Sequence, residues 1–225
     1  ECVGVDVSTA ERFTAKYNDD VSLSARVFKT VVDPFIGKYS LMKVCTGTLK
    51  PDTVIYNVNK DAEEKVQKVY VLRGKDVIEV PELKAGDIGA GGKLNVTQTG
   101  DTIAVRTAPI VYHKPKISTP YTYMAYAAKT KGDEDKISSA LAKMMDEDLT
   151  LRSVSDNENR QTLLYGIGEQ QLEVVVSKLQ ARYKVDIVLS KPKFAFRETL
   201  RKKVEAQGKY KKQSGGHGQY GHVKM

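Results

Sequence analysis

The sequence of 225 residues contains only two cysteines, Cys2 and Cys45, so it cannot form a disulfide framework or a zinc knuckle. Such sparing use of cysteine suggests a reducing, cytoplasmic setting. No apolar run approaches the roughly 18 residues that a membrane-spanning helix needs, and we therefore expect no membrane partner. The first residues, ECVGVDVSTAERF, show neither the basic start nor the apolar core of a signal peptide.

Motifs for nucleotide hydrolysis and for nucleophilic catalysis are also missing. No G-x-x-x-x-G-K-[ST] occurs, so the sequence lacks the phosphate loop of a GTPase. No local motif suggests a Ser-His-Asp or Cys-His set. His217 and His222 lie close together, but no cysteine is near and the nearest acid is Glu205, which argues against a metal site. We expect no catalytic residue, no metal and no cofactor within these residues.

Lysine and arginine give the chain a formal net charge of +8 at pH 7. From Lys191 onward they far outnumber the acids, which are Glu198 and Glu205. A basic segment of this kind fits nucleic acid, an acidic surface or a merely solvated face, and composition leaves the three readings open. The chain starts at Glu1 rather than Met and stops within strand-like sequence at Met225, so we expect a piece of a longer protein.

Short strands separated by glycine and proline turns fill the first half of the sequence. Two similar runs, AGDI at 85–88 and TGDTI at 99–103, are interpreted as turns that feed strands. Because closing a sheet removes its exposed edges, this pattern predicts a small closed β-barrel. Alternating apolar residues predict strands over 39–46, 53–58 and 64–72, with turn chemistry at 33–37 and 47–52.

The second half alternates strand and helix periods. Asp133 begins a helix whose apolar stripe runs through Ile137, Ala140, Leu141 and Met144. The order strand-helix-strand-strand-helix-strand predicts a ferredoxin-like βαββαβ domain. The fold class is therefore multidomain β and α+β. The expected strands are 121–128, 149–153, 161–167 and 183–189, and the second helix carries Leu172, Val175, Val176 and Leu179.

Three segments resemble consecutive domains of elongation factor G, the GTPase that drives ribosomal translocation. DPFIGKYSLMKVCTGTLKPDTVIYN, followed by KAGDIGA and TGDTI, is similar to the β-barrel second domain of translational GTPases. GIGEQQLEVVVSKLQARYKVD looks like the third domain, and QSGGHGQYGHV at 213–223 looks like the opening of the fourth. Two departures stand out: the glycine-rich run 89–92, which is usually more apolar, and His217, where the family commonly has Arg.

The resemblance implies a central fragment with the following limits: 1–17 linker or end of a preceding domain, 18–106 translation-factor β-barrel, 107–119 linker, 120–190 ferredoxin-like domain, and 191–225 the first strands of an incomplete fourth domain. The parent would hold GTP and magnesium in its own N-terminal GTPase domain and act on the ribosome. The fragment itself would dock on the ribosome and relay the nucleotide state.

The resemblance also implies two interaction sites. Gly168, Glu169, Gln170 and Gln171 correspond to the family's G-E-L-H and would face the GTPase domain; the two glutamines suggest a divergent paralogue. The expected contacts with ribosomal RNA, through phosphates and base stacking, are Lys209, Lys211, Lys212, Gln213, Ser214, Gly215, Gly216, His217, Gly218 and Tyr220.

Other functions remain open at the level of sequence. A ribosome-protection or ribosome-recycling relative would differ in distal loops of the fourth domain. A stand-alone RNA-binding or adaptor module would have no GTPase function at all. The run 216–221 also matches G-x-G-x-x-G, but a dinucleotide site requires that motif to leave a strand and open a helix, and no helical period follows it.

Overall fold

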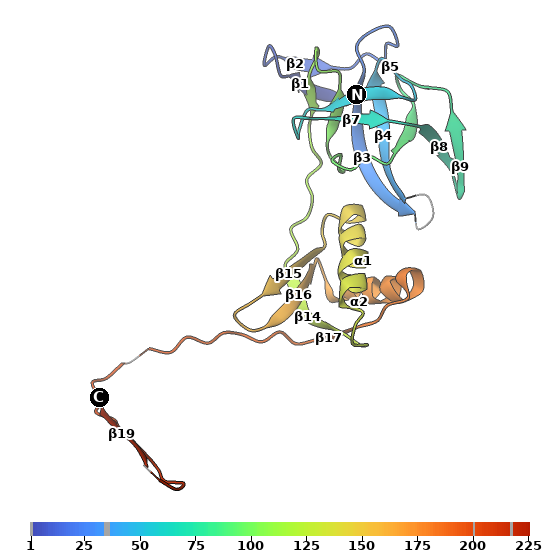
Figure 1. The fold of residues 1–225 in the computed structure, drawn as a ribbon. Coiled ribbons are helices and arrows are strands. Elements are labelled where there is room, and N and C mark those ends of the chain that lie inside the picture. The colour runs from blue at the N-terminus through green and yellow to red at the C-terminus, as the bar shows by residue number, and fades with distance from the viewer. Residues whose placement is uncertain (1, 34–36, 200, 217) are drawn as a thin grey trace. The chain divides into compact units, whose positions relative to one another are not determined.

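The structure, a computed structural model, describes residues 2–33, 37–199, 201–216 and 218–225. The chain divides into two compact units, Glu1–Lys193 and Phe194–Met225. The first unit contains a β-rich part followed by an α+β part, and the second contains a single β-hairpin (Figure 1).

An eight-stranded antiparallel sheet forms most of the β-rich part (Figure 1). The short strands β5 (Thr48–Leu49) and β10 (Leu83–Lys84) pair separately. In spatial order the eight strands are β7 (Ala62–Val66), β6 (Thr53–Asn57), β12 (Thr102–Ala104), β3 (Ser24–Asp33), β4 (Gly37–Thr46), β11 (Ile88–Gly92), β8 (Val69–Arg73) and β9 (Asp76–Val80).

The sheet curls around an apolar core to which strands from both of its ends contribute, including Met42, Ile55, Val66, Val69 and Ile103. Register shifts between β3 and β4 help the sheet to curl, since an extra residue in one strand increases its local twist. The fold class is confirmed, but the described strands make a curled half-barrel bounded by β7 and β9 rather than the expected closed barrel.

Two other expectations for this part change. The predicted strand over 64–72 is two strands, β7 and β8, because Val66 and Val69 both turn into the core with a break between them. The glycine-rich run forms the inner strand β11, which pairs with β4 and β8. A Cβ at Gly89 would meet the side chain of Leu83 and lie 2.8 Å from the Tyr70 carbonyl oxygen, so close packing requires glycine there.

A small three-stranded sheet packs against the half-barrel. It consists of β1 (Val3–Asp6), β2 (Arg12–Thr14) and β13 (Ile110–Tyr112), which lie in segments interpreted as a linker or domain end. Tyr112 is buried against Cys45, and its hydroxyl is 2.6 Å from the Ser24 hydroxyl. Strands of three or four residues are too short to show a period, which explains why the sequence did not reveal them.

The α+β part has the predicted ferredoxin-like order. Its sheet runs β15-β16-β14-β17, with both helices packed on one face through Leu141, Leu164, Leu172 and Leu179. The elements are β14 (Thr122–Ala128), α1 (Glu134–Glu147), β15 (Arg152–Asp156), β16 (Gln161–Gly166), α2 (Glu169–Lys178), a π-helical turn (Leu179–Tyr183) and β17 (Ile187–Ser190).

Boundaries shift at three points in this part. β17 starts at Ile187 rather than at residue 183, because the π-helical turn continues α2 and ends at Lys184 with φ of +57°. β15 covers Arg152–Asp156 rather than 149–153. Asp133 precedes α1 as expected, but its carboxylate accepts a hydrogen bond from Lys136 instead of capping the helix.

Candidate functional site

The turn expected to face a GTPase domain is the N-terminus of α2. Gly168 is the last residue before the helix, with extended backbone (φ −176°, ψ 162°). Glu169 and Gln170 are exposed to solvent and accessible to a partner. Glu169 suits this position because a negative charge at a helix N-terminus interacts favourably with the helix dipole.

Gln171 behaves differently from its two exposed neighbours. Its side-chain oxygen accepts a 2.7 Å hydrogen bond from the backbone N–H of Ile167. Its side-chain nitrogen donates to Asp148 (2.8 Å) and to the hydroxyl of Thr150 (2.7 Å). Gln171 therefore ties the turn before α2 to the loop after α1. Gln171, which was expected to face the GTPase domain, makes these hydrogen bonds within the ferredoxin-like part.

One residue before Asp148, the end of α1 contacts strand β3 of the half-barrel. Glu147 accepts a 2.8 Å hydrogen bond from the backbone N–H of Val32, and Arg182 donates a 2.8 Å hydrogen bond to the Val32 carbonyl. Glu147 and Arg182 are joined to each other at 2.9 Å and 3.3 Å. We call these three residues the Val32 clamp.

The clamp explains an unusual feature of α1. The helix ends in three successive acids, Asp146, Glu147 and Asp148, although negative charge at a helix C-terminus is unfavourable. Each acid has a partner: Asp146 lies 3.6 Å from Lys38, Glu147 is in the clamp, and Asp148 bonds Gln171. The hydrogen bond from Arg182 to Glu147 raises the pKa of the guanidinium above its usual value.

The clamp and the Gln171 bonds border the same cleft, which has a volume of about 460 Å³. Thr30 and Val31 of β3 line one side, and Glu147, Gln171 and Lys178 line the other. Two sets of hydrogen bonds thus connect the turn before α2 to β3, one at Gln171 and Asp148 and one at Glu147 and Val32, and the peptide link between Glu147 and Asp148 joins them. Sequence analysis missed Glu147 and Arg182; the acids at a helix C-terminus were the available signal.

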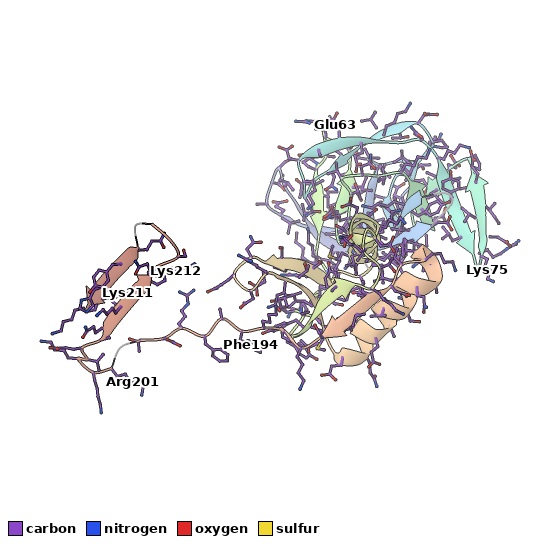
Figure 2. All side chains as sticks on the ribbon, turned by 60° about the horizontal axis from the view of Figure 1, so that its bottom comes forward. Glu63, Lys75, Phe194, Arg201, Lys211 and Lys212 are labelled. Atoms are coloured by element: carbon purple, nitrogen blue, oxygen red, sulfur yellow. The ribbon has the colours of Figure 1, made fainter. Side chains whose placement is uncertain are left out.

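The residues expected to contact RNA lie on the hairpin of β18 (Gln207–Lys212) and β19 (Gln219–Lys224). Every described residue of these two strands is exposed, and Figure 2 shows Lys211 and Lys212 on this hairpin. Lys211 pairs with Tyr220, and Lys212 pairs with Gln219. Because successive residues alternate in direction, Lys211 and Lys212 point to opposite faces.

The two faces of the hairpin differ in chemistry. Lys209 and Lys211 share one face with Tyr220, and the Lys209 ammonium lies 5.8 Å from the centre of the Tyr220 ring. Lys212 shares the other face with Tyr210. The predicted set is therefore split. The connection between the strands holds Gln213, Ser214, Gly215, Gly216 and Gly218, all exposed, whereas His217 lies outside the described residues.

The structure bears on the motifs that the sequence argued against. The end of the G-x-G-x-x-G run enters strand β19 and not a helix, so the backbone geometry of a dinucleotide site is not formed. Among the described residues, no three or more His, Cys, Asp or Glu side chains gather as a metal site would require. In the same residues no helix combines the length and apolar character needed to cross a bilayer.

Comparisons with known proteins give consecutive matches. The family model "Elongation factor G domain 2" matches residues 22–106, "Elongation Factor G, domain III" matches residues 117–191, and "Elongation factor G, domain IV" matches residues 192–225. A crystal structure of a protein from Thermus thermophilus is 35% identical over 91% of this chain, with a TM-score of 0.73. The chain spans 31% of the length of that protein.

Proposed function

Because the chain belongs to the elongation factor G family as a fragment of its central domains, we propose that its parent promotes GTP-dependent ribosomal translocation in protein synthesis. The fragment docks on the ribosome and relays the nucleotide state of a GTPase domain outside these residues. The observation that carries the proposal is the unbroken succession of second, third and fourth domains in the family matches.

The hydrogen-bond series between the turn and β3 supports the relay. A partner that moves the exposed Glu169 and Gln170 also moves Gln171, which holds Asp148 at the end of α1. The adjacent Glu147 holds Val32 of the half-barrel. A movement of the turn before α2 is thereby coupled to strand β3 of the half-barrel through the C-terminal end of α1. Rigid connections of this kind transmit hinge and shear motions between domains.

The sequence offers no motif for GTP and magnesium. The sequence has no phosphate loop, and the described residues have no cluster of metal-ligating side chains. We therefore assign both to the GTPase domain of the parent. Calorimetry on the fragment should detect neither GTP nor GDP at micromolar affinity, and binding of either would contradict this assignment.

We further propose that the hairpin contacts ribosomal RNA, that the parent works in the cytoplasm, and that Gly168–Gln171 meets the GTPase domain. The domain limits stay as inferred from the sequence. The hairpin is the best-placed RNA contact because its lysines are exposed beside stackable tyrosines. The face with Lys209, Lys211 and Tyr220 carries more charge than the face with Lys212 and Tyr210.

Ribosome binding by the full-length protein tests the hairpin. Reversing the charges of Lys209 and Lys211 should weaken binding and flatten its salt dependence by roughly 0.7 to 0.9 in log–log slope for each phosphate that the hairpin no longer neutralises. Lys212→Glu, on the opposite face, is the matched control and should have a smaller effect. An unchanged salt slope in the double variant would show that the hairpin does not face RNA.

Translocation by the full-length protein tests the function itself. In a single-turnover assay, the parent with GTP should move peptidyl-tRNA into the puromycin-reactive site. Gln171→Ala and Glu147→Ala should each slow this step, and the double variant should be no slower than the worse single one if both belong to one relay. Subunit splitting or displacement of a ribosome-bound inhibitor without translocation would instead assign the recycling or protection relatives.

A further inference from the structure

The ferredoxin-like part has a second face to which neither the relay nor the hairpin assigns a role. Both helices pack on one side of the sheet, against Met124, Tyr126 and Leu164 among others. Side chains that alternate with these point to the other side. On the central strands β14 and β16, that helix-free face carries Tyr123 and Tyr165.

The two tyrosines form a stacked pair. Tyr123 lies directly opposite Tyr165 in the sheet, and their ring centres are 4.9 Å apart with an angle of 28° between the ring planes. Each tyrosine is partly exposed. Arg152, on the edge strand β15, lies directly opposite Tyr165 on its other side and is exposed. We call Tyr123, Tyr165 and Arg152 the tyrosine platform.

The chain itself crosses the other end of this face. Lys193 exchanges two 2.8 Å hydrogen bonds with the side chain of Gln161, at the start of β16. Because β14 lies between β17 and β16, the segment that links β17 to Gln161 passes over β14. Tyr165 is four residues beyond Gln161, or about 13 Å along the strand, so the platform lies outside this crossing.

We propose that the tyrosine platform binds single-stranded RNA, with unpaired bases stacking on the two rings and a phosphate paired with Arg152. Tyrosines on the two central strands of a four-stranded sheet are suitably placed to stack successive bases. The rings are already held in position by each other. The platform shares no residue with the hairpin. It is tested by RNA binding to the fragment, whereas the hairpin is tested by ribosome binding of the full-length protein.

Charge favours RNA over an acidic or neutral protein partner as the occupant. The charged side chain paired next to Tyr165 is Arg152. The acid farther along β15 on this face, Asp156, already accepts hydrogen bonds from Gln161 and Asn159, which lower its pKa. Asp156 therefore stays ionised, but it lies four residues along β15 from Arg152, about 13 Å away and beyond a Debye length of about 8 Å at physiological salt, so a phosphate at Arg152 meets a locally positive site.

The test measures binding of a fluorescently labelled oligouridylate of about eight nucleotides to the whole fragment by anisotropy. The hairpin charges are first reversed at Lys209, Lys211 and Lys212, so that only other sites contribute. In this background Tyr123→Ala and Tyr165→Ala should each weaken binding about tenfold, as expected for the loss of one stacked base. Tyr165→Phe keeps the ring and should retain the affinity.

Arg152→Ala should lower the salt slope by about 0.7, the value for one phosphate contact with a single strand. The proposal is overturned if the charge-reversed fragment no longer binds the RNA, or if the alanine variants bind as tightly as their parent. It is also overturned if the platform variants change only self-association or binding to another protein. None of these results depends on the translocation assay. RNA binding by the platform can therefore be refuted while the proposed role in translocation stands, and the reverse also holds.

Discussion

The Val32 clamp allows a sharp prediction about how the half-barrel and the ferredoxin-like part are joined. Glu147→Ala removes the acceptor of the Val32 N–H and the partner of Arg182. The side chains of Glu147 and Arg182 are 18% and 31% exposed, so solvent screens the pair only partly. Hydrogen bonds to charged groups in such settings contribute about 1.5–3 kcal/mol.

Part of that loss is offset. Removing a carboxylate from the C-terminal turn of α1 relieves an unfavourable interaction with the helix dipole of roughly 0.3–1 kcal/mol. The net local destabilisation is then about 1–2 kcal/mol, which corresponds to a factor of about 5 to 30 in the opening equilibrium. The amide of Val32 should exchange with deuterium faster by that factor, because local opening governs its protection.

Hydrogen exchange followed by NMR on the fragment measures this directly. Glu147→Gln keeps an oxygen that can accept from Val32 but loses the charge, so its effect should be intermediate. Asp186→Ala is the matched control, since it removes a surface ion pair with Lys129 (3.8 Å) away from the clamp. If Val32 exchanges equally fast in Glu147→Ala and the unmodified fragment, the clamp does not hold β3.

Two further predictions concern the half-barrel. Gly47→Ala should lower the free energy of unfolding by about 2 kcal/mol or more, because φ is +68° and a Cβ would lie 2.6 Å from the Val21 carbonyl oxygen. Gly74→Ala is the control, because Gly74 has a similar φ of +62° but open space around it, so that only Gly47→Ala adds a steric clash. Equal urea midpoints for the two variants would count against the clash. Burial raises the pKa of the Cys45 thiol to about 12. In a Cys2→Ser background we expect Cys45 to react with a disulfide reagent at about pH 8 only after unfolding. Since the unfolded thiol ionises near about 8.5, the folded state should lose stability as pH rises from there toward 12, and Cys45→Ala should lose less over the same range; rapid labelling of the native protein would refute the burial argument.

Long periodic segments were predictable from the sequence. The stripe of Ile137, Ala140, Leu141 and Met144 is buried as expected, and the strand-helix order led to the correct ferredoxin-like fold. These features depend on local periodicity, which one sequence displays. The half-open form of the barrel was not predictable, because it depends on how distant strands β7 and β9 end up in the sheet.

The candidate sites divide in the same way. Glycines, lysines and tyrosines of the hairpin were recognisable as a motif, but their division between two faces follows from the strand register. The Val32 clamp joins residues 32, 147 and 182, and it uses backbone groups of Val32 that leave no trace in the side-chain pattern. Likewise, Arg182 lies in a π-helical turn, Leu179–Tyr183, that extends α2 as far as the first residue of the predicted strand 183–189.

The two hydrogen bonds between Gln161 and Lys193 also explain where the first compact unit ends. Strand β17 ends at Ser190, but Lys193, three residues later, is still bonded to Gln161 at the start of β16 in the same sheet. The second unit begins at the next residue, Phe194, which is 61% exposed (Figure 2). Replacing Gln161 with alanine would release residues 191–193 and so lengthen the segment between the two units, and it would also remove the hydrogen bond from Gln161 to Asp156.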